Sequence, residues 1–415
     1  MMAAEGPFLA AVIARLGDPK FNLASYGVAF AFAVLMEAPV IMLMSAATAL
    51  VEDSGSYRRL RSFAHGLNAA ATGLLLLILI PPVYQMLAVS ALGLPDRVVE
   101  LTYGALWLFL PWPAAIGYRR FLQGVLIRSG RTRLVALGTV VRLISMAVAA
   151  LFFAAVLGFE GAWVGAAALS TGVCAEAAAA RWMARATIRE LLASPGSSDR
   201  SAEGLGYRQI AAFYYPLALT SLIGLAIQPT LTFFMGRAPF PVESLAVFPV
   251  VHALSFIFRA LGLAYQDAAI ALMGRRHEHQ PEIARFATGL GLAASAGLAA
   301  VAFTPLASVW FATVSGLTPE LVSFALVPAR VLVPLPALAV LLNVQRAILM
   351  TGRRTQPITA ASAIEITTVV VLFPTFAWGL GLMGVTAAFL AFLGGRVAAN
   401  LYLGPRCRVV LREAR

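Results

Sequence analysis

Apolar stretches of about 20 residues recur along the whole 415-residue chain, and they constrain its fold more than any other feature. A helix rises about 1.5 Å per residue, so each stretch can cross a hydrocarbon core roughly 30 Å thick. Only 12% of the side chains are charged and 60% are hydrophobic, which excludes an ordinary soluble domain. The apolar residues do not alternate in short segments, as a transmembrane β-barrel would require. We therefore expect an all-α, polytopic membrane protein.

A spanning helix is expected wherever an apolar stretch reaches spanning length. The expected ranges are 24–50, 63–92, 98–128, 134–156, 162–185, 209–235, 244–273, 284–312, 320–350, 358–380 and 384–404, after a shorter apolar piece at 7–16. The chain would thus have about 12 helices, the first of them short.

Basic residues fall in alternate loops between these stretches, and they set the expected topology. Loops rich in basic residues stay in the cytoplasm, whereas the intervening loops, such as 92–96, are nearly free of arginine. The basic loops hold Arg58, Arg59, Arg61, Arg128, Arg131, Arg133, Arg189, Arg200, Arg208, Arg275, Arg276, Arg353, Arg354, Arg406, Arg408 and Arg412. We expect a multi-pass protein of the inner (plasma) membrane with a cytoplasmic C-terminus. The net charge of +12 then reflects topology and lipid contact rather than a nucleic-acid site.

Similarity at an offset of 222 or 223 residues indicates an internal repeat. The matches are Phe63-Ala-His-Gly-Leu67 with Phe286-Ala-Thr-Gly-Leu290, Leu110-Pro-Trp-Pro113 with Val333-Pro-Leu-Pro336, Ser129-Gly-Arg131 with Thr351-Gly-Arg353, and Ala46, Ala47, Ala49 and Leu50 with Ala268, Ala269, Ala271 and Leu272. Each repeat would carry six helices, and an even number returns the chain to its starting side. The two halves should therefore be parallel repeats, related by an axis along the membrane normal.

The repeat also gives the expected domain organisation. An N-terminal half covers 1–185, a cytoplasmic linker 186–208, a C-terminal half 209–404 and a cytoplasmic tail 405–415. Arg15 aligns with Arg237, so the partner of the helix that begins near Tyr214 would start before Met1. We expect helix 1 to be truncated, through a start site assigned too far downstream or a shortened protein. A divergent, short first helix is the alternative.

Two six-helix halves, a proline late in the fourth helix of each and a following Gly-Arg turn resemble the multidrug and toxin extrusion (MATE) group. This group belongs to the multidrug/oligosaccharidyl-lipid/polysaccharide (MOP) flippase superfamily. Leu23-Ala-Ser-Tyr-Gly-Val-Ala-Phe30 and Phe213-Tyr-Tyr-Pro-Leu-Ala-Leu219 are more closely similar to segments of its progressive ankylosis (ANKH) branch.

The resemblance implies a MATE-like fold of two six-helix bundles. The MATE group exports mostly cationic drugs against Na+ or H+, whereas the ANKH branch would imply export of polyanions such as pyrophosphate, citrate or nucleotides. Cation coupling in many MATE proteins uses an acidic residue of the first helix, most of which we expect to be missing. The resemblance therefore leaves Na+ or H+ coupling open.

Ionisable residues inside the apolar stretches are the candidate site, because each needs a partner or a watery cavity. Glu37 lies mid-helix in 24–50, and the repeat places Arg259 at the equivalent position of 244–273. We expect these two to pair across the halves, lining the cavity of an alternating-access transporter. His252, Gln266 and Asp267 lie on or beside the polar face of the same helix as Arg259. The alternative is that these groups only fix helix packing.

A second set of residues extends the candidate site. Arg330 lies near mid-depth, and Arg142 and Glu365 occupy nearly equivalent places in the fifth helix of each half. Glu176 and Arg396 are expected to pair or to reach the membrane surface. Four prolines, Pro111, Pro113, Pro334 and Pro336, are expected to kink helices 4 and 10, either as hinges or as fixed bends.

No catalytic or metal-binding motif stands out, and Cys174 and Cys407 have no metal-ligand spacing. We expect a secondary transporter rather than an enzyme, with no cofactor besides a coupling ion. Its expected substrate is a small organic or phosphate-type anion, because buried basic residues outnumber buried acids. Cation-coupled multidrug efflux and flipping of a lipid-linked oligosaccharide are the alternatives. The sequence does not assign the substrate, the direction of flux or the oligomeric state.

Overall fold

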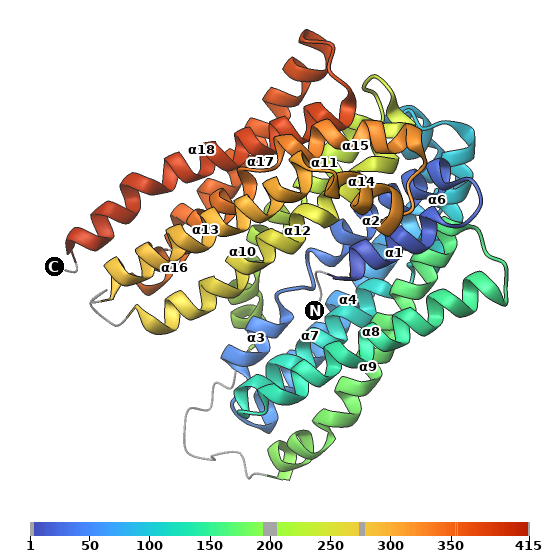
Figure 1. The fold of residues 1–415 in the computed structure, drawn as a ribbon. Helices are drawn as coiled ribbons and strands as arrows, with labels where there is room; N and C mark the ends of the chain where they lie inside the picture. The colour runs from blue at the N-terminus through green and yellow to red at the C-terminus, as the bar shows by residue number, and fades with distance from the viewer. Residues whose placement is uncertain (1–3, 194–205, 274–278, 353, 355, 414–415) are drawn as a thin grey trace. The chain divides into compact units, whose positions relative to one another are not determined.

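The computed structural model describes residues 4–193, 206–273, 279–352, 354 and 356–413, and these residues form helices without any strand (Figure 1). In chain order the helices are α1 (Glu5–Ala14), α2 (Pro19–Glu37), α3 (Leu43–Leu50), α4 (Ser54–Ile78), α5 (Pro81–Gln85), η2 (Met86–Ala91), α6 (Asp96–Leu108), α7 (Trp112–Arg128), α8 (Thr132–Ala155), α9 (Gly161–Ala193), α10 (Tyr207–Leu225), α11 (Ile227–Met235), α12 (Pro241–Leu272), α13 (Gln280–Phe303), α14 (Leu306–Ser308), η3 (Val309–Val314), α15 (Pro319–Val331), α16 (Leu335–Thr351), α17 (Gln356–Pro374), η4 (Thr375–Gly379) and α18 (Gly384–Glu413). The elements labelled η are π-helical. The expectation of an all-α chain is confirmed.

Eight of the described helices are long and apolar enough to cross a membrane. The number rises to ten if each of two bent pairs is one span: α4 with α5 and η2, bent by 74°, and α15 with α16, bent by 44°. The chain is therefore an integral, multi-pass membrane protein.

The chain forms two compact units. Unit 1 contains 28–91 and 96–225, and unit 2 contains 3–27, 92–95 and 226–415. This division differs from the expected halves, because α1 and the first part of α2 belong to unit 2 and α10 belongs to unit 1. The reason lies in packing: α1 packs against α12, and α10 packs against α4.

The internal repeat is visible in the helix order. α6, α7 and α9 begin at 96, 112 and 161, and α15, α16 and α18 begin 223 residues later, at 319, 335 and 384. α1 matches α11, which begins 222 residues after it, and α12 matches α2 together with α3. α10 has no counterpart among the described helices of the first repeat.

Both proline pairs interrupt a helix. The expected helices 98–128 and 320–350 are each divided, and Pro111 and Pro334 are the N-cap residues of α7 and α16. Pro113 and Pro336 then lie in the first helical turn, where a missing N–H needs no partner. The prolines thus start a new helix instead of only bending one. Their role as hinges stays a prediction.

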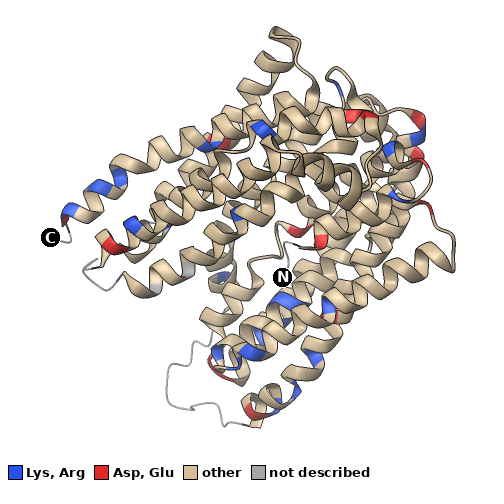
Figure 2. Ribbon diagram, in the orientation of Figure 1, with Lys and Arg blue, Asp and Glu red and all other residues tan. Residues whose placement is uncertain are grey.

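Two expected non-helical segments are partly helical. α9 continues to Ala193 and α18 to Glu413, so helix extends into the expected linker and through most of the expected tail. Arg354 donates to both Glu413 carboxylate oxygens, at 2.8 and 3.0 Å, which holds the end of α18 near the end of α16. Basic residues mark this last part of α18 (Figure 2).

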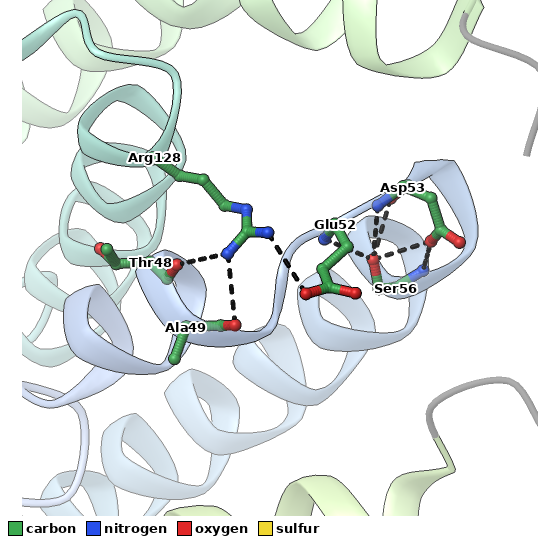
Figure 3. Close-up of polar contacts among 6 residues, drawn as sticks. All are labelled: Thr48, Ala49, Glu52, Asp53, Ser56 and Arg128. Carbon is green, nitrogen blue, oxygen red and sulfur yellow. Dashed lines mark hydrogen bonds and ion pairs between the residues drawn. The ribbon is translucent and has the colours of Figure 1, made fainter.

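The turn between α3 and α4 is fixed by two sets of polar contacts (Figure 3). Asp53 is the N-cap of α4 and forms a capping box with Ser56, whose backbone N–H donates to Oδ1 of Asp53 at 2.7 Å. Arg128, at the end of α7, donates to the Thr48 carbonyl at 3.0 Å and to Glu52 at 3.3 Å. The hydrogen bond from Arg128 satisfies the Thr48 carbonyl at the end of α3, which has no partner within its own helix.

Candidate functional site

Glu37 lies at a break in its helix. α2 ends at Glu37, and the chain turns before α3 begins. Hydroxyl groups of α10 satisfy two carbonyl groups of the turn: Ser221 donates to Ala38 at 2.6 Å, and Tyr214 donates to Pro39. The expectation of one helix across 24–50 is wrong here, because Pro39 has no N–H and disfavours helix at the residue before it.

The Glu37 carboxylate faces three guanidinium groups within unit 1. Arg119 and Arg120 of α7 and Arg142 of α8 act electrostatically on it, and the Trp112 indole lies beside it. Glu37 is partly buried. Among the described residues, however, no basic group lies within 4.0 Å of its carboxylate oxygens. The acid is thus surrounded by positive charge without a direct ion pair.

A second acid, Glu176 of α9, forms ion pairs with two of these arginines. It is fully buried and accepts from Arg119, and Gln123 donates to it at 3.1 Å. Arg142 lies 3.8 Å from the same carboxylate. Glu176 therefore joins α7, α8 and α9 around one buried negative charge.

Unit 2 holds a second polar cluster around Arg259 of α12, which is only 9% exposed. Arg259 donates to Nε2 of His252 at 3.0 Å, which lies seven residues earlier on the same face of α12. Its guanidinium also lies over the Phe256 and Phe392 rings, 5.5 and 5.4 Å from their centroids. Among the described residues, no carboxylate forms an ion pair with it.

The single acid of this cluster is paired with another arginine. Glu365 of α17 is buried and forms an ion pair with Arg396 of α18 at 2.9 Å. Arg346 of α16 also interacts electrostatically with Glu365 and Arg396, and its guanidinium donates to Ser362 at 3.5 Å. The part of unit 2 that the structure describes thus places three arginines around one acid.

The repeat-related helix pairs carry ion pairs of opposite polarity. In unit 1, α8 supplies Arg142 and α9 supplies Glu176, whereas in unit 2 α17 supplies Glu365 and α18 supplies Arg396. Arg142 and Glu365 are therefore each paired inside their own unit. The sequence placed these charges in equivalent helices but did not give their partners.

Gln266 and Arg330, also expected in the site, lie outside these contacts. Gln266 lies 3.9 Å from the sulfur of Met350, and the Asp267 side chain lies outside the described residues. Arg330 is exposed, contrary to the expectation of a buried position, because it ends α15 and lies over Phe303 of α13. Glu37 and Arg259 belong to different units, so their direct pairing stays a prediction.

Three residues of these clusters, Arg119, Arg120 and Arg346, were not in the expected site. Arg346 lies four residues before the end of the apolar stretch 320–350, from where a long side chain can reach the membrane surface without a partner. Two adjacent arginines nine residues before the end of an apolar stretch were the available signal for the other two. No group of three or more potential metal ligands occurs among the described residues.

No protein-family model matches the chain, and no curated protein matches it. Solved structures match almost its whole length. A multidrug resistance MATE family transporter of the MOP superfamily, in an inward-facing conformation, has a TM-score of 0.72 at 17% identity, covering 99% of this chain and 94% of that one.

Two further structures broaden the comparison. The lipid II flippase MurJ, in an inward closed conformation, has a TM-score of 0.71 at 11% identity, covering 99% of this chain and 88% of its own. A MOP superfamily transporter from Pyrococcus furiosus, described as having a binding pocket of reverse polarity, has a TM-score of 0.61 at 17% identity and covers 99% and 92%. These similarities establish a MATE-type fold.

Proposed function

We propose that the protein is a secondary transporter that exports small organic or phosphate-type anions by alternating access, in the inner (plasma) membrane. The fold supports transport, because similar structures are described as transporters and flippases in inward-facing and outward-facing conformations. Export of polyanions would agree with the resemblance of 23–30 and 213–219 to the ANKH branch.

The observation that carries the anionic substrate is the unbalanced charge of Arg259. A buried charge without a counter-ion is costly in an apolar interior. Arg259 has only neutral neighbours within direct contact, and the nearby acid Glu365 is already paired with Arg396. An anionic group of the substrate would supply the missing counter-charge.

The balance of charged residues in the two clusters also favours an anionic substrate. Six arginines and three glutamates, buried or partly buried, make up the two clusters: Arg119, Arg120, Arg142, Arg259, Arg346 and Arg396, with Glu37, Glu176 and Glu365. Each unit, taken by itself, therefore contains more arginines than glutamates in its cluster. The aromatic rings beside Arg259 hold its guanidinium in place, and its buried Nε has no hydrogen-bond partner among the described residues.

Flipping of a lipid-linked oligosaccharide is the second candidate. The MurJ flippase has nearly the same TM-score as the MATE transporter, and a phosphate-bearing lipid would use the same unbalanced arginine. Cation-coupled multidrug efflux would instead use Glu37 as its acid. Phosphate recognition favours arginine in either anionic case.

Counterflow in proteoliposomes tests the proposal. Labelled citrate, pyrophosphate and ATP are compared with a cationic dye, for the wild type, Arg259→Ala and the exposed Arg133→Ala. We expect one of the anions to exchange in the wild type and in Arg133→Ala, with at least a tenfold loss in Arg259→Ala. Exchange of the dye alone would contradict anion transport, and absence of all exchange would favour the lipid-linked substrate.

A further inference from the structure

We propose that His252 is a positioning residue for the anion site: its imidazole accepts a hydrogen bond from Arg259 and holds that guanidinium in the orientation that binds the anionic group of the substrate. This inference rests on the proposed function, for which it names the residue that prepares Arg259.

The first step is the direction of the hydrogen bond between the two side chains. Nη2 of Arg259 lies 3.0 Å from Nε2 of His252. A guanidinium has only donors, so the imidazole nitrogen is the acceptor and the ring carries its proton on Nδ1. An imidazolium has no acceptor and could not make this contact. His252 is therefore neutral while it holds Arg259.

The second step is which contact fixes the orientation of the guanidinium. The Phe256 and Phe392 rings lie 5.5 and 5.4 Å from it and attract its charge. The face of a phenyl ring offers no directional acceptor, so the guanidinium could turn above it and keep this attraction. A hydrogen bond, in contrast, weakens steeply as its angle departs from linear. Of the contacts described for Arg259, the one to His252 therefore sets its orientation.

The imidazole is itself held by aromatic rings on both sides. Phe248, one turn before it in α12, and Phe256, one turn after it, stack on the ring with centroid distances of 5.7 and 6.4 Å. Phe248 in turn stacks on Phe389 of α18 at 5.0 Å. The acceptor of Arg259 thus belongs to a packed column of rings, and such support is what keeps a binding group in one geometry.

The third step is the consequence for binding. A free arginine side chain loses conformational freedom when it binds an anion, whereas a guanidinium that is already held has lost this freedom beforehand. The Nε of Arg259 is buried and has no hydrogen-bond partner among the described residues, so a donor remains for the anion while Nη2 contacts His252. Removing the acceptor should therefore weaken anion binding, although the positive charge is unchanged.

Two substitutions separate the acceptor from the ring. His252→Phe keeps a flat ring in the aromatic column and removes the acceptor, whereas His252→Gln removes the ring and keeps an acceptor oxygen. Counterflow is measured over a range of concentrations of the anion that the wild type exchanges (citrate, pyrophosphate or ATP). In His252→Phe we expect the half-saturating concentration to rise about tenfold, since one hydrogen bond from a charged group is lost, with little change in the maximal rate. His252→Gln should stay close to the wild type, as should the control His279→Phe at the exposed N-cap of α13.

A double variant tests whether His252 acts through Arg259. If it does, adding His252→Phe to Arg259→Ala should leave the half-saturating concentration where Arg259→Ala alone puts it. A further loss of the same size as in the single variant would contradict the inference. So would a normal half-saturating concentration in His252→Phe, or equal losses in His252→Phe and His252→Gln.

Nitrogen-15 NMR of histidine-labelled wild type gives a second measurement that needs no transport. The His252 signals, assigned by their loss in His252→Phe, should show a neutral ring with its proton on Nδ1, and a proton on Nε2 would overturn the inference. A wild type that exchanges no anion would overturn the proposed function itself, and the NMR signals would still decide whether His252 holds Arg259.

Discussion

Glu176 is the single residue on which most of the buried charge of unit 1 depends. Its fully buried carboxylate contacts Arg119, Gln123 and Arg142. In Glu176→Ala, Arg119 would remain in the interior without a counter-ion, and breaking a buried ion pair in this way costs about 3–5 kcal/mol. We expect a large fall in the thermal unfolding temperature of the purified protein, measured in detergent.

An exposed acid of the same helix is the control for this prediction. Glu190 pairs with Arg131 at 2.8 Å, and the two side chains are 63% and 36% exposed. Exposed ion pairs contribute roughly 0–1 kcal/mol, so Glu190→Ala should change the unfolding temperature little. Equal losses in the two variants would show that Glu176 has no special structural role.

The sequence predicted charged residues inside the membrane but did not show which of them have a partner. Glu37 and Arg259 could be predicted as site residues from the repeat, and each lies in a cluster of buried charge. Their partners depend on which helix faces compact packing brings together, and periodicity does not specify that. Arg119 and Arg120 illustrate the difficulty: the two are neighbours in sequence, yet only Arg119 is paired with Glu176.

At the scale of a single element, the N-cap of α4 gives a pH-dependent prediction. The Ser56 backbone N–H donates to the Asp53 carboxylate and lowers the pKa of Asp53 below its usual value. The charged form is therefore favoured in the folded state. Its contribution is present above the pKa of the unfolded chain and is lost as the pH falls through the lower pKa of the folded state.

Thermal unfolding across acidic pH checks this cap. Asp53→Ala should lose about 1 kcal/mol at neutral pH, because an N–H at the start of α4 loses its acceptor. The difference between the variant and the wild type should shrink as the pH falls. A difference that stays constant down to the pH at which Asp is protonated would rule out the charged cap.

The break between α2 and α3 gives a second prediction at this scale. Tyr214 of α10 donates to the Pro39 carbonyl, whereas its neighbour Tyr215 is 69% exposed. Tyr214→Phe leaves a partly buried acceptor without its donor and should cost about 1 kcal/mol. Tyr215→Phe should leave stability unchanged, and a loss of equal size there would argue against a role for the hydroxyl.

The positions of most helices could be predicted from the apolar pattern, whereas their interruptions could not. α8 and α12 begin and end within three residues of the expected 134–156 and 244–273. The breaks before α3 and α5 lie inside uninterrupted apolar stretches, where hydropathy does not change. Proline chemistry explains both of them in retrospect: Pro39 lies in the first break, and Pro81 and Pro82 begin α5.

At the scale of the whole molecule, the two repeats share one order of helices, but the acid and the base of their ion pairs lie on opposite helices. α8 and α9 correspond to α17 and α18, but the acid lies on α9 in one unit and on α17 in the other. The same helix scaffold therefore accepts either polarity, provided that each buried charge finds a partner. Arg259 and Arg120 have no such partner among the described residues. We expect these two side chains to be needed for function rather than for folding.

The arginines predict an orientation of the whole chain in the membrane, and this prediction can be tested at the two ends of one helix. α8 has 24 residues, so it is about 36 Å long and spans the bilayer. In a variant with Cys174 and Cys407 replaced by Ser, a single cysteine at Arg133 or Leu157 would mark opposite ends of α8. Because basic loops stay in the cytoplasm, a membrane-impermeant maleimide should label Leu157→Cys in intact cells and Arg133→Cys only after permeabilisation. Labelling in the reverse pattern would contradict the predicted topology.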